Sequence, residues 1–216
     1  MTKTTLRLTE IFHSLQGEAR SAGTPTVFVR LTGCPLRCGY CDTAYAFTGG
    51  VLYELDQVLR EVSHWQTRHV CVTGGEPLAQ PACLELLTAL CDAGYEVSLE
   101  TSGALDVARV DPRVSKVMDL KTPGSGEAAR NRYDNLAHIR AHDQLKFVLC
   151  DEADYHWAGE MLTRHALAAL TADIWYSPVY GELDPTELAA WILRDRLPVR
   201  LQIQLHKLLW QDARGK

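Results

Sequence analysis

Residues 69–101 read HVCVTGGEPLAQPACLELLTALCDAGYEVSLET and alternate between two kinds of pattern. His69–Thr73 and Glu96–Thr101 are short runs rich in β-branched residues, which indicate strands. Between them, Pro81–Ala93 repeats apolar residues at helical spacing. A strand, a helix and a second strand in succession are typical of a βαβ unit, whose strands are parallel and whose crossover is right-handed. The stretch therefore predicts an α/β fold.

The same alternation continues on both sides of this stretch. Further strand patterns lie at 26–31, 116–120, 145–150, 174–176 and 199–205, and further helix patterns at 51–65, 130–142, 153–170 and 185–196. A complete eight-fold barrel usually takes about 250 residues, so a shorter chain has room for about six units. With 216 residues, we expect one domain, residues 1–216, folded as an open, partial (β/α)6-type TIM barrel.

The composition excludes several classes of protein. A hydrophobic fraction of 46% and a charged fraction of 23% exclude intrinsic disorder. No apolar run approaches the roughly 20 residues that span a bilayer, and the first residues lack the apolar segment of a secretory signal. The net charge of −5 provides no basic surface for nucleic acid. We therefore expect a cytoplasmic protein with a small-molecule ligand and no direct nucleic-acid or membrane partner.

Side chains alternate between the two faces of a strand, and several of the predicted strands separate apolar from polar residues. In the run 26–31, Val27 and Val29 share one side, whereas Phe28 and Arg30 share the other. The runs 96–101 and 199–205 show the same division, with Glu100 and, just beyond the last run, His206 on the polar sides. Either this polar face is solvated, or it forms a cup that holds a ligand.

Three of the seven cysteines, Cys34, Cys38 and Cys41, have C-x3-C-x2-C spacing directly after a predicted strand. A structural zinc site needs four ligands, usually in two separated pairs, and no partner pair follows. Because iron-sulfur clusters are ordinarily held by four cysteines, three suggest a 4Fe-4S cluster with one iron left open for a ligand. The remaining four, Cys71, Cys83, Cys91 and Cys150, lie in apolar stretches, where we expect core thiols.

A second motif, Thr73-Gly74-Gly75-Glu76-Pro77-Leu78, follows about thirty residues after the cysteines. Adjacent glycines at the end of a strand let the backbone approach a ligand closely. Together, in this order, the two motifs resemble the radical S-adenosylmethionine (SAM) superfamily. The resemblance implies that the cluster binds SAM, that Gly74, Gly75 and Glu76 bind it too, and that Tyr40 matches the aromatic residue before the third cysteine.

More segments resemble one member family, the 7-carboxy-7-deazaguanine synthases: Ser14–Glu18, Cys41–Thr43, Glu100–Gly103, Asp119–Gly126, Ser177–Val179 and Gln204–Lys207. The resemblance implies a lyase that converts 6-carboxy-5,6,7,8-tetrahydropterin to 7-carboxy-7-deazaguanine with loss of ammonia. It further implies catalytic use of SAM, a need for Mg2+, and a place in the biosynthesis of queuosine, a tRNA modification. No catalytic residue is expected beyond the cofactor-derived radical.

The resemblance also assigns residues to ligands. Thr43 would bind Mg2+, and Arg30 would bind the substrate carboxylate, for which a planar guanidinium is well suited. The other expected substrate-binding residues are Leu15, Gln16, Gly17, Glu18, Thr73 and His206. The expected SAM-binding residues are Tyr40, Cys41, Asp42, Gly74, Gly75, Glu76, Glu100, Ser102, Lys121, Gly124, Ser125, Gly126, Ser177 and Pro178.

By residue type alone, several of these residues also have purely structural interpretations. Arg30 can be an ion-paired surface residue, Thr43 a cap, Gln16 part of a surface loop and His206 an edge histidine. The chain also runs on past the Gln204–Lys207 match to Lys216.

Two other activities remain compatible with the cysteine motif. One is an activase that makes a glycyl radical on a partner protein, and the segments Ser14–Glu18 and Cys41–Thr43 speak against it. The other is an electron carrier without catalysis, which needs no SAM pocket and usually has four cysteine ligands. For the synthase, the resemblance implies a homodimer and a flavodoxin- or ferredoxin-type reductant as partners.

Overall fold

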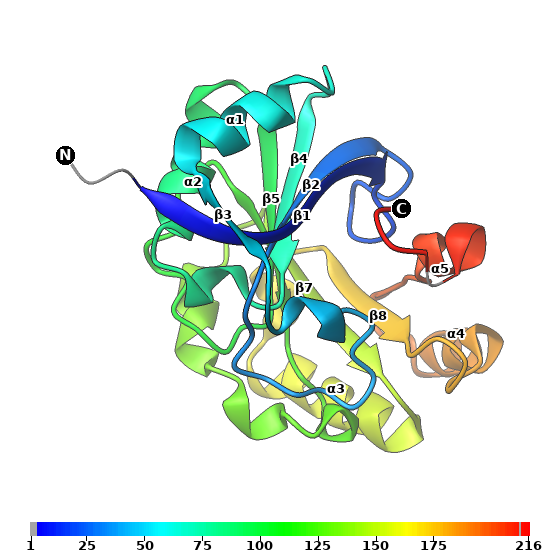
Figure 1. The fold of residues 1–216 in the computed structure, drawn as a ribbon. Coiled ribbons are helices and arrows are strands. Elements are labelled where there is room, and N and C mark those ends of the chain that lie inside the picture. Colours follow the sequence, from blue (N-terminus) through cyan, green and yellow to red (C-terminus); the bar gives the residue numbers. More distant parts are fainter. Residues whose placement is uncertain (1–3, 212) are drawn as a thin grey trace.

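The computed structural model describes residues 4–211 and 213–216. These residues form one sheet of nine strands in the order β3-β1-β2-β4-β5-β6-β7-β8-β9 (Figure 1). From β2 onwards, neighbouring strands are parallel, whereas β1 is antiparallel to both β2 and β3. The strands are β1 Thr5–Leu15, β2 Pro25–Leu31, β3 Val51–Glu54, β4 His69–Gly74, β5 Glu96–Thr101, β6 Ser115–Asp119, β7 Gln144–Leu149, β8 Ile174–Pro178 and β9 Arg200–Leu201.

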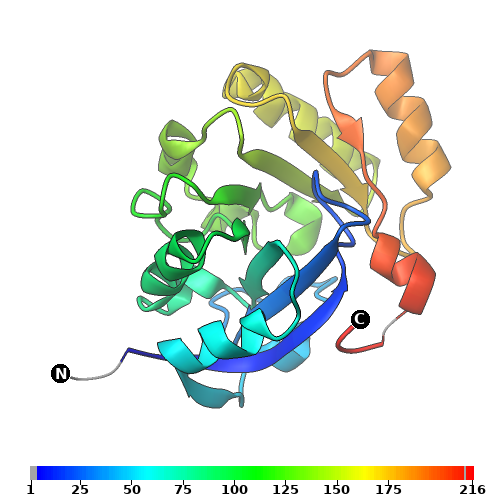
Figure 2. The same ribbon diagram turned by 90° about the horizontal axis from the view of Figure 1, so that it is seen from above.

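Helices cover the outer face of the curved sheet, as the view from above shows (Figure 2). They are α1 Leu55–Ser63, α2 Cys83–Asp92, α3 Glu152–Arg164 and α4 Pro185–Asp195, whereas the short α5 Leu205–Trp210 lies at the cavity and contributes His206 to its wall. Within the described residues, the end strands β3 and β9 do not pair with each other, so the barrel is open. The expected α/β fold, an open partial TIM barrel, is confirmed. None of the described helices is long and apolar enough to cross a membrane.

The division of strand faces is confirmed where the sheet meets the helices. Val27, Val29 and Leu31 of β2 are fully buried in the core, together with Val72 of β4 and Leu99 of β5. The opposite side of β2, with Phe28 and Arg30, lines a cavity. Among the expected core thiols, those of Cys71 and Cys83 are buried, whereas Cys91 and Cys150 are only half-buried.

Two expectations near the N-terminal half need correction. The longest strand, β1, has no counterpart among the predicted strands. Residues 51–54 were expected to begin the helix of 51–65, but they form β3, in which Val51 pairs with Leu8 of β1. Helix α1 begins only at Leu55. The edge of β1 offers backbone hydrogen bonds to these residues, and such tertiary pairing overrides local helical spacing.

Two expectations in the second half are also wrong. Residues 130–142 form no α-helix but short 3-10 turns, Ala128–Arg130 and Tyr133–His138. Here the buried side chain of Asn135 bonds the backbone of Gly103, Leu105 and Val107, an alternative to a helical ladder.

The expected strand 199–205 is reduced to Arg200–Leu201. The side chain of Gln202 binds both backbone groups of Ala19, and Leu205 then begins α5. His206 therefore lies on a helix and not on a strand.

Candidate active site

A cavity of about 440 Å³ opens at the carboxyl ends of the parallel strands. Its wall includes Arg30 of β2, Thr73 of β4, Glu100 of β5, Asp119 of β6 and Lys146 of β7. Parallel α/β barrels build their sites at this end, because the loops that follow each strand meet there. The second interpretation of the polar strand face, a cup lined by polar side chains, therefore agrees with the fold.

The cavity brings together most of the residues expected from the sequence. Those that line it are Leu15, Gln16, Gly17, Glu18, Arg30, Cys34, Cys38, Tyr40, Cys41, Asp42, Thr43, Thr73, Gly74, Gly75, Glu100, Ser102, Lys121 and His206. Six expected SAM-binding residues do not line it: Glu76, Gly124, Ser125, Gly126, Ser177 and Pro178. Sequence spacing could not separate these two groups, because members of both lie at or near the carboxyl ends of strands.

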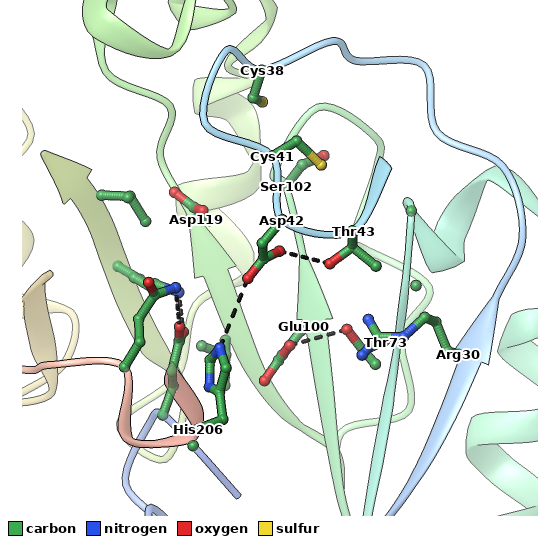
Figure 3. Close-up of a pocket in the computed structure, with 18 of the residues that line it drawn as sticks. Arg30, Cys38, Cys41, Asp42, Thr43, Thr73, Glu100, Ser102, Asp119 and His206 are labelled. Atoms are coloured by element: carbon green, nitrogen blue, oxygen red, sulfur yellow. Dashed lines mark hydrogen bonds and ion pairs between the residues drawn. The ribbon is translucent and has the colours of Figure 1, made fainter. Parts of the chain in front are cut away.

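The three cysteines lie in the loop that follows β2 and line the cavity. Figure 3 shows Cys38 and Cys41 at one end of it. Burial raises the pKa of the Cys34 and Cys38 thiols, while the nearby Lys121 ammonium acts in the opposite direction. Among the described residues, no three His, Cys, Asp or Glu side chains gather closely enough to hold one metal ion. The three thiols line the same cavity, and cysteine thiolates are the ligands that hold iron-sulfur clusters.

Gly75 leaves room for the backbone beside this loop. A Cβ atom on Gly75 would collide with the carbonyl oxygen of Gly33 and with Cys34, so only glycine lets β4 end against the cysteine loop. Glu76 follows it, fully buried, and its carboxylate accepts hydrogen bonds from Thr101 and from the backbone and hydroxyl of Ser102. Glu76 thus joins the ends of β4 and β5 and does not itself line the cavity.

Asp42, Thr43 and His206 lie together in the middle of the cavity, where Asp42 contacts both other residues (Figure 3). Thr43 Oγ1 donates to Asp42 Oδ1 at 2.7 Å, and His206 Nε2 lies 3.7 Å from Asp42 Oδ2. Burial opposes the charge of Asp42, but the contacts with His206 and Thr43 hold its pKa well below the usual range. A Cβ atom on Gly17 would collide with the His206 imidazole, so Gly17 makes room for this group.

Acidic and amide side chains surround the deeper part of the cavity. Glu100 accepts hydrogen bonds from Thr73 Oγ1 at 3.0 Å and from Gln16 Nε2 at 3.3 Å. Glu18 forms an ion pair with Lys146 and accepts a hydrogen bond from Gln204 at 2.8 Å. Two carboxylates and an amide are suited to a flat ligand whose edge carries several N–H donors.

Arg30 provides the positive charge beside these acids. Its Nε atom lies 2.8 Å from Glu10 Oε1, and its guanidinium stands over the rings of Phe12 and Tyr45. Burial disfavours the charge, but Tyr45 and Glu10 keep the pKa of Arg30 above its ordinary value. In Figure 3 the Arg30 side chain points into the cavity near Thr73. A permanently charged guanidinium in this place suits an anionic ligand group.

Several residues near the cavity were missed by sequence reasoning. Glu10 lies on β1, which the sequence pattern did not predict, and Lys146 stands in an apolar run. Asp119 pairs with Lys121 at 2.7 Å, while its Oδ1 atom is buried without a hydrogen-bond partner in the described residues. Asp119 was expected only as part of a matching segment. For Lys146 and Asp119 the signal was the strand alternation, which places them on the cavity side, whereas Glu10 had no such signal.

The C-terminal residues return to the cavity mouth. In both views the chain end lies beside β1 and β2 (Figures 1 and 2). The Arg214 guanidinium stands 4.2 Å from the centre of the Tyr45 ring, and Lys216 contributes to the cavity wall. The residues that follow the Gln204–Lys207 match therefore cover part of the opening.

Comparisons with known proteins agree with this geometry. Residues 28–120 match the model of the radical SAM superfamily. The chain is 45% identical to the 7-carboxy-7-deazaguanine synthase of Chlorobaculum tepidum, over 99% of both chains. It is 40% identical to that of Koribacter versatilis, over 95% of this chain and 97% of the relative. The crystal structure of QueE from Escherichia coli has a TM-score of 0.75 at 24% identity, covering 94% of this chain and 95% of that one, and so shares the fold.

Proposed function

The chain belongs to the 7-carboxy-7-deazaguanine synthase family of radical SAM enzymes, and from that premise we propose how its cavity serves the reaction. It is a lyase that uses a 4Fe-4S cluster and SAM. The reaction we propose converts 6-carboxy-5,6,7,8-tetrahydropterin to 7-carboxy-7-deazaguanine and ammonia, with Mg2+. Loss of ammonia balances the atoms, so the ring contraction needs no external oxidant.

The observation that carries this proposal is one cavity lined by the three cysteines, by Arg30 and by Glu100. Cys34, Cys38 and Cys41 would hold the cluster, and Tyr40, Gly74, Gly75, Ser102 and Lys121 would surround SAM. When bound, the cluster and SAM supply a radical that removes a hydrogen atom from carbon 6 of the substrate. The protein's contribution is to hold that carbon in place and to keep water away from it.

The remaining residues of the cavity would bind the substrate. Arg30 would hold its carboxylate, because a guanidinium can donate two parallel hydrogen bonds to that group. Gln16 and Glu18 would bind the pterin edge. We move Glu100 from the expected SAM-binding set to this edge, because it accepts hydrogen bonds from Gln16 and Thr73. Thr73 and His206 would contact the ring. Thr43 would bind Mg2+ together with substrate oxygens and water, since a neutral hydroxyl alone is a weak ligand.

The six expected SAM-binding residues that do not line the cavity would act indirectly. The backbone carbonyl of Ser125 accepts a hydrogen bond from Gly39 N at 3.1 Å, so the segment 124–126 supports the cysteine loop. The side chain of Glu76 fixes the backbone of Ser102. Ser177 and Pro178 end β8 and are fully buried.

For the whole protein, we propose a cytoplasmic homodimer reduced by a flavodoxin or ferredoxin. The single sheet supports a single-domain chain, 1–216, of which residues 1–3 and 212 lie outside the described part. The net charge of −5 does not favour binding to nucleic acid.

The test is an anaerobic incubation of the reconstituted enzyme with dithionite, SAM, Mg2+ and 6-carboxy-5,6,7,8-tetrahydropterin. We expect mass spectrometry to detect 7-carboxy-7-deazaguanine, in smaller amount when Mg2+ is left out. The variant Cys38→Ala should lose both product formation and SAM cleavage, whereas the control Cys91→Ala, on α2, should keep both. Accumulation of 5'-deoxyadenosine beside unchanged substrate would instead favour a glycyl-radical activase.

A further inference from the structure

A β-bulge in β1 brings a carboxylate directly opposite Arg30. Leu8 pairs with Leu31 and Glu10 with Arg30, so two steps along β1 correspond to one step along β2. The extra residue, Thr9, is held by a hydrogen bond of 2.7 Å between its hydroxyl and that of Thr32. Without the bulge, Thr9 would face Arg30, and Glu10 would pair with Val29 on the core side. Bulges near active sites commonly re-aim a side chain in this way.

The pairing leaves one side of the guanidinium available. Glu10 Oε1 receives hydrogen bonds from Arg30 Nε and from the Tyr45 hydroxyl, at 2.8 and 2.7 Å. In the described part of the chain, neither terminal nitrogen of Arg30 has a hydrogen-bond partner within the protein. The Arg30 and Glu10 side chains are 15% and 20% exposed, so water screens the pair only weakly. Glu10 thereby fixes the guanidinium through its Nε atom.

Aromatic rings restrict the remaining motion. The Arg30 guanidinium lies 5.7 Å from the centre of the Phe12 ring and 5.9 Å from that of Tyr45. Phe12 itself stacks on Phe28 at 4.8 Å, with ring planes 7° apart. A planar cation held at Nε and packed against two rings has little freedom to rotate, and its two Nη atoms together can donate the two parallel hydrogen bonds that a carboxylate accepts.

We propose that Glu10 and Tyr45 are positioning residues that orient Arg30 for two-point binding of the substrate carboxylate. The inference rests on the proposed role of Arg30 and extends it to a specificity device. A pterin with the carboxylate gains the two hydrogen bonds, whereas one without it leaves a buried, partly paired cation. The orientation of Arg30 therefore sets the preference for a carboxylated substrate.

The experiment compares two ligands on the reconstituted enzyme with SAM. Dissociation constants are measured anaerobically for 6-carboxy-5,6,7,8-tetrahydropterin and for tetrahydropterin without the carboxylate. We expect Glu10→Ala to weaken binding of the carboxylated ligand about tenfold to a hundredfold, the range for charge-assisted hydrogen bonds. Binding of the ligand without the carboxylate should change little. Tyr45→Phe should have the same effect in smaller measure.

Conservative and control variants separate positioning from folding. Glu10→Gln keeps an acceptor for Arg30 Nε and should recover part of the preference that Glu10→Ala loses. Glu85→Gln, whose carboxylate accepts a hydrogen bond from Thr4 on the far side of the sheet, should bind both ligands as the wild type does. Iron content and SAM affinity should be equal in all variants. In Glu10→Ala and Tyr45→Phe, the KM for the carboxylated substrate should rise by a larger factor than kcat falls.

Two results would overturn the proposal in distinguishable ways. If Arg30→Ala loses the preference while Glu10→Ala and Tyr45→Phe keep it in full, Arg30 binds the carboxylate without help from these residues. If Arg30→Ala itself keeps the preference, the proposed role of Arg30 is wrong, and the positioning role with it.

Discussion

At the scale of single residues, the ion pair of Glu18 and Lys146 places two opposite charges in a buried part of the cavity. Both side chains are largely buried, with exposures of 11% and 12%. Burial alone would raise the pKa of Glu18, but Lys146, followed by His206, lowers it below its ordinary value. The same pair raises the pKa of Lys146 in spite of burial. Removing one partner would leave an unpaired buried charge, which costs more than the pair itself contributes.

These pKa shifts predict how stability depends on pH. The lowered pKa of Glu18 gives stability that is present above the unfolded value of 4.5 and is lost as the pH falls through the folded value. The raised pKa of Lys146 gives stability that is present below 10.5 and is lost only as the pH rises through its folded value. The pair should therefore stabilise the fold throughout the neutral range.

We predict that Lys146→Met lowers the free energy of unfolding by about 3 to 5 kcal/mol at pH 7, because it leaves Glu18 charged and unpaired. At pH 4 the deficit should shrink, since the isolated Glu18 takes up a proton. Urea unfolding at the two pH values measures both quantities, and Glu18→Gln combined with Lys146→Met should recover much of the loss. A deficit of the same size at both pH values would contradict the ion-pair account.

Sequence reasoning found the residues that belong to motifs and missed those that act through neighbours. The spacing of Cys34, Cys38 and Cys41 predicted a metal site, and the position of Arg30 on a polar strand face indicated a ligand contact. Glu10 and Tyr45 carry no local signal, because their relation to Arg30 depends on a pairing between strands and on a bulge. Such relations arise only when the chain is folded.

At the scale of elements, the segment 122–126 connects a helix start to the cysteine loop. The buried Asp154 near the start of α3 accepts hydrogen bonds from the Thr122 hydroxyl and from Gly124 N, both at 2.8 Å. It accepts a third from Cys150 N at 3.0 Å. On its other side, the segment accepts a hydrogen bond from Gly39 N at the Ser125 carbonyl. Asp154 thus anchors the support of the loop that carries the cysteines.

We predict that Asp154→Ala lowers stability by about 1 to 3 kcal/mol, the usual cost of unsatisfied buried donors, and weakens cluster retention. Iron content after gel filtration and SAM affinity are the measurements. The control is Asp184→Ala, which removes the N-cap of α4 at a similar cost in stability but has no contact with Asp154 or segment 122–126 among the described residues. Equal loss of iron in both variants would show that general instability, and not the anchor, is responsible.

The elements also show where pattern reasoning fails. The units β4-α2-β5 and β7-α3-β8 follow from strand and helix periodicity, because their apolar faces pack into the core, whereas the predicted helix between β6 and β7 is absent. The run 199–205 alternates like a strand, yet it leaves the sheet after Leu201, where Gln202 binds the backbone of Ala19. Alternation at the edge of a sheet does not decide how far pairing continues. That depends on partners distant in the sequence.

At the scale of the whole molecule, the open barrel explains why one cavity can hold a cluster, SAM and a substrate. Residues from Phe12 to Lys216 line the same site, to which the carboxyl ends of the parallel strands β2 and β4 to β7 contribute. The cysteine loop occupies one end of the cavity, and the carboxylates of Glu18 and Glu100 and the guanidinium of Arg30 occupy the rest. The class of fold followed from the sequence, whereas the closure by Arg214 and Lys216 at the mouth did not.

The most direct test of the central claim is a turnover experiment with 6-carboxy-5,6,7,8-tetrahydropterin that carries deuterium at carbon 6. If the cavity holds this carbon against the radical supplied by SAM, mass spectrometry should find deuterium in the 5'-deoxyadenosyl group recovered from SAM or 5'-deoxyadenosine. Product formed without any transfer of deuterium to that group would contradict the account.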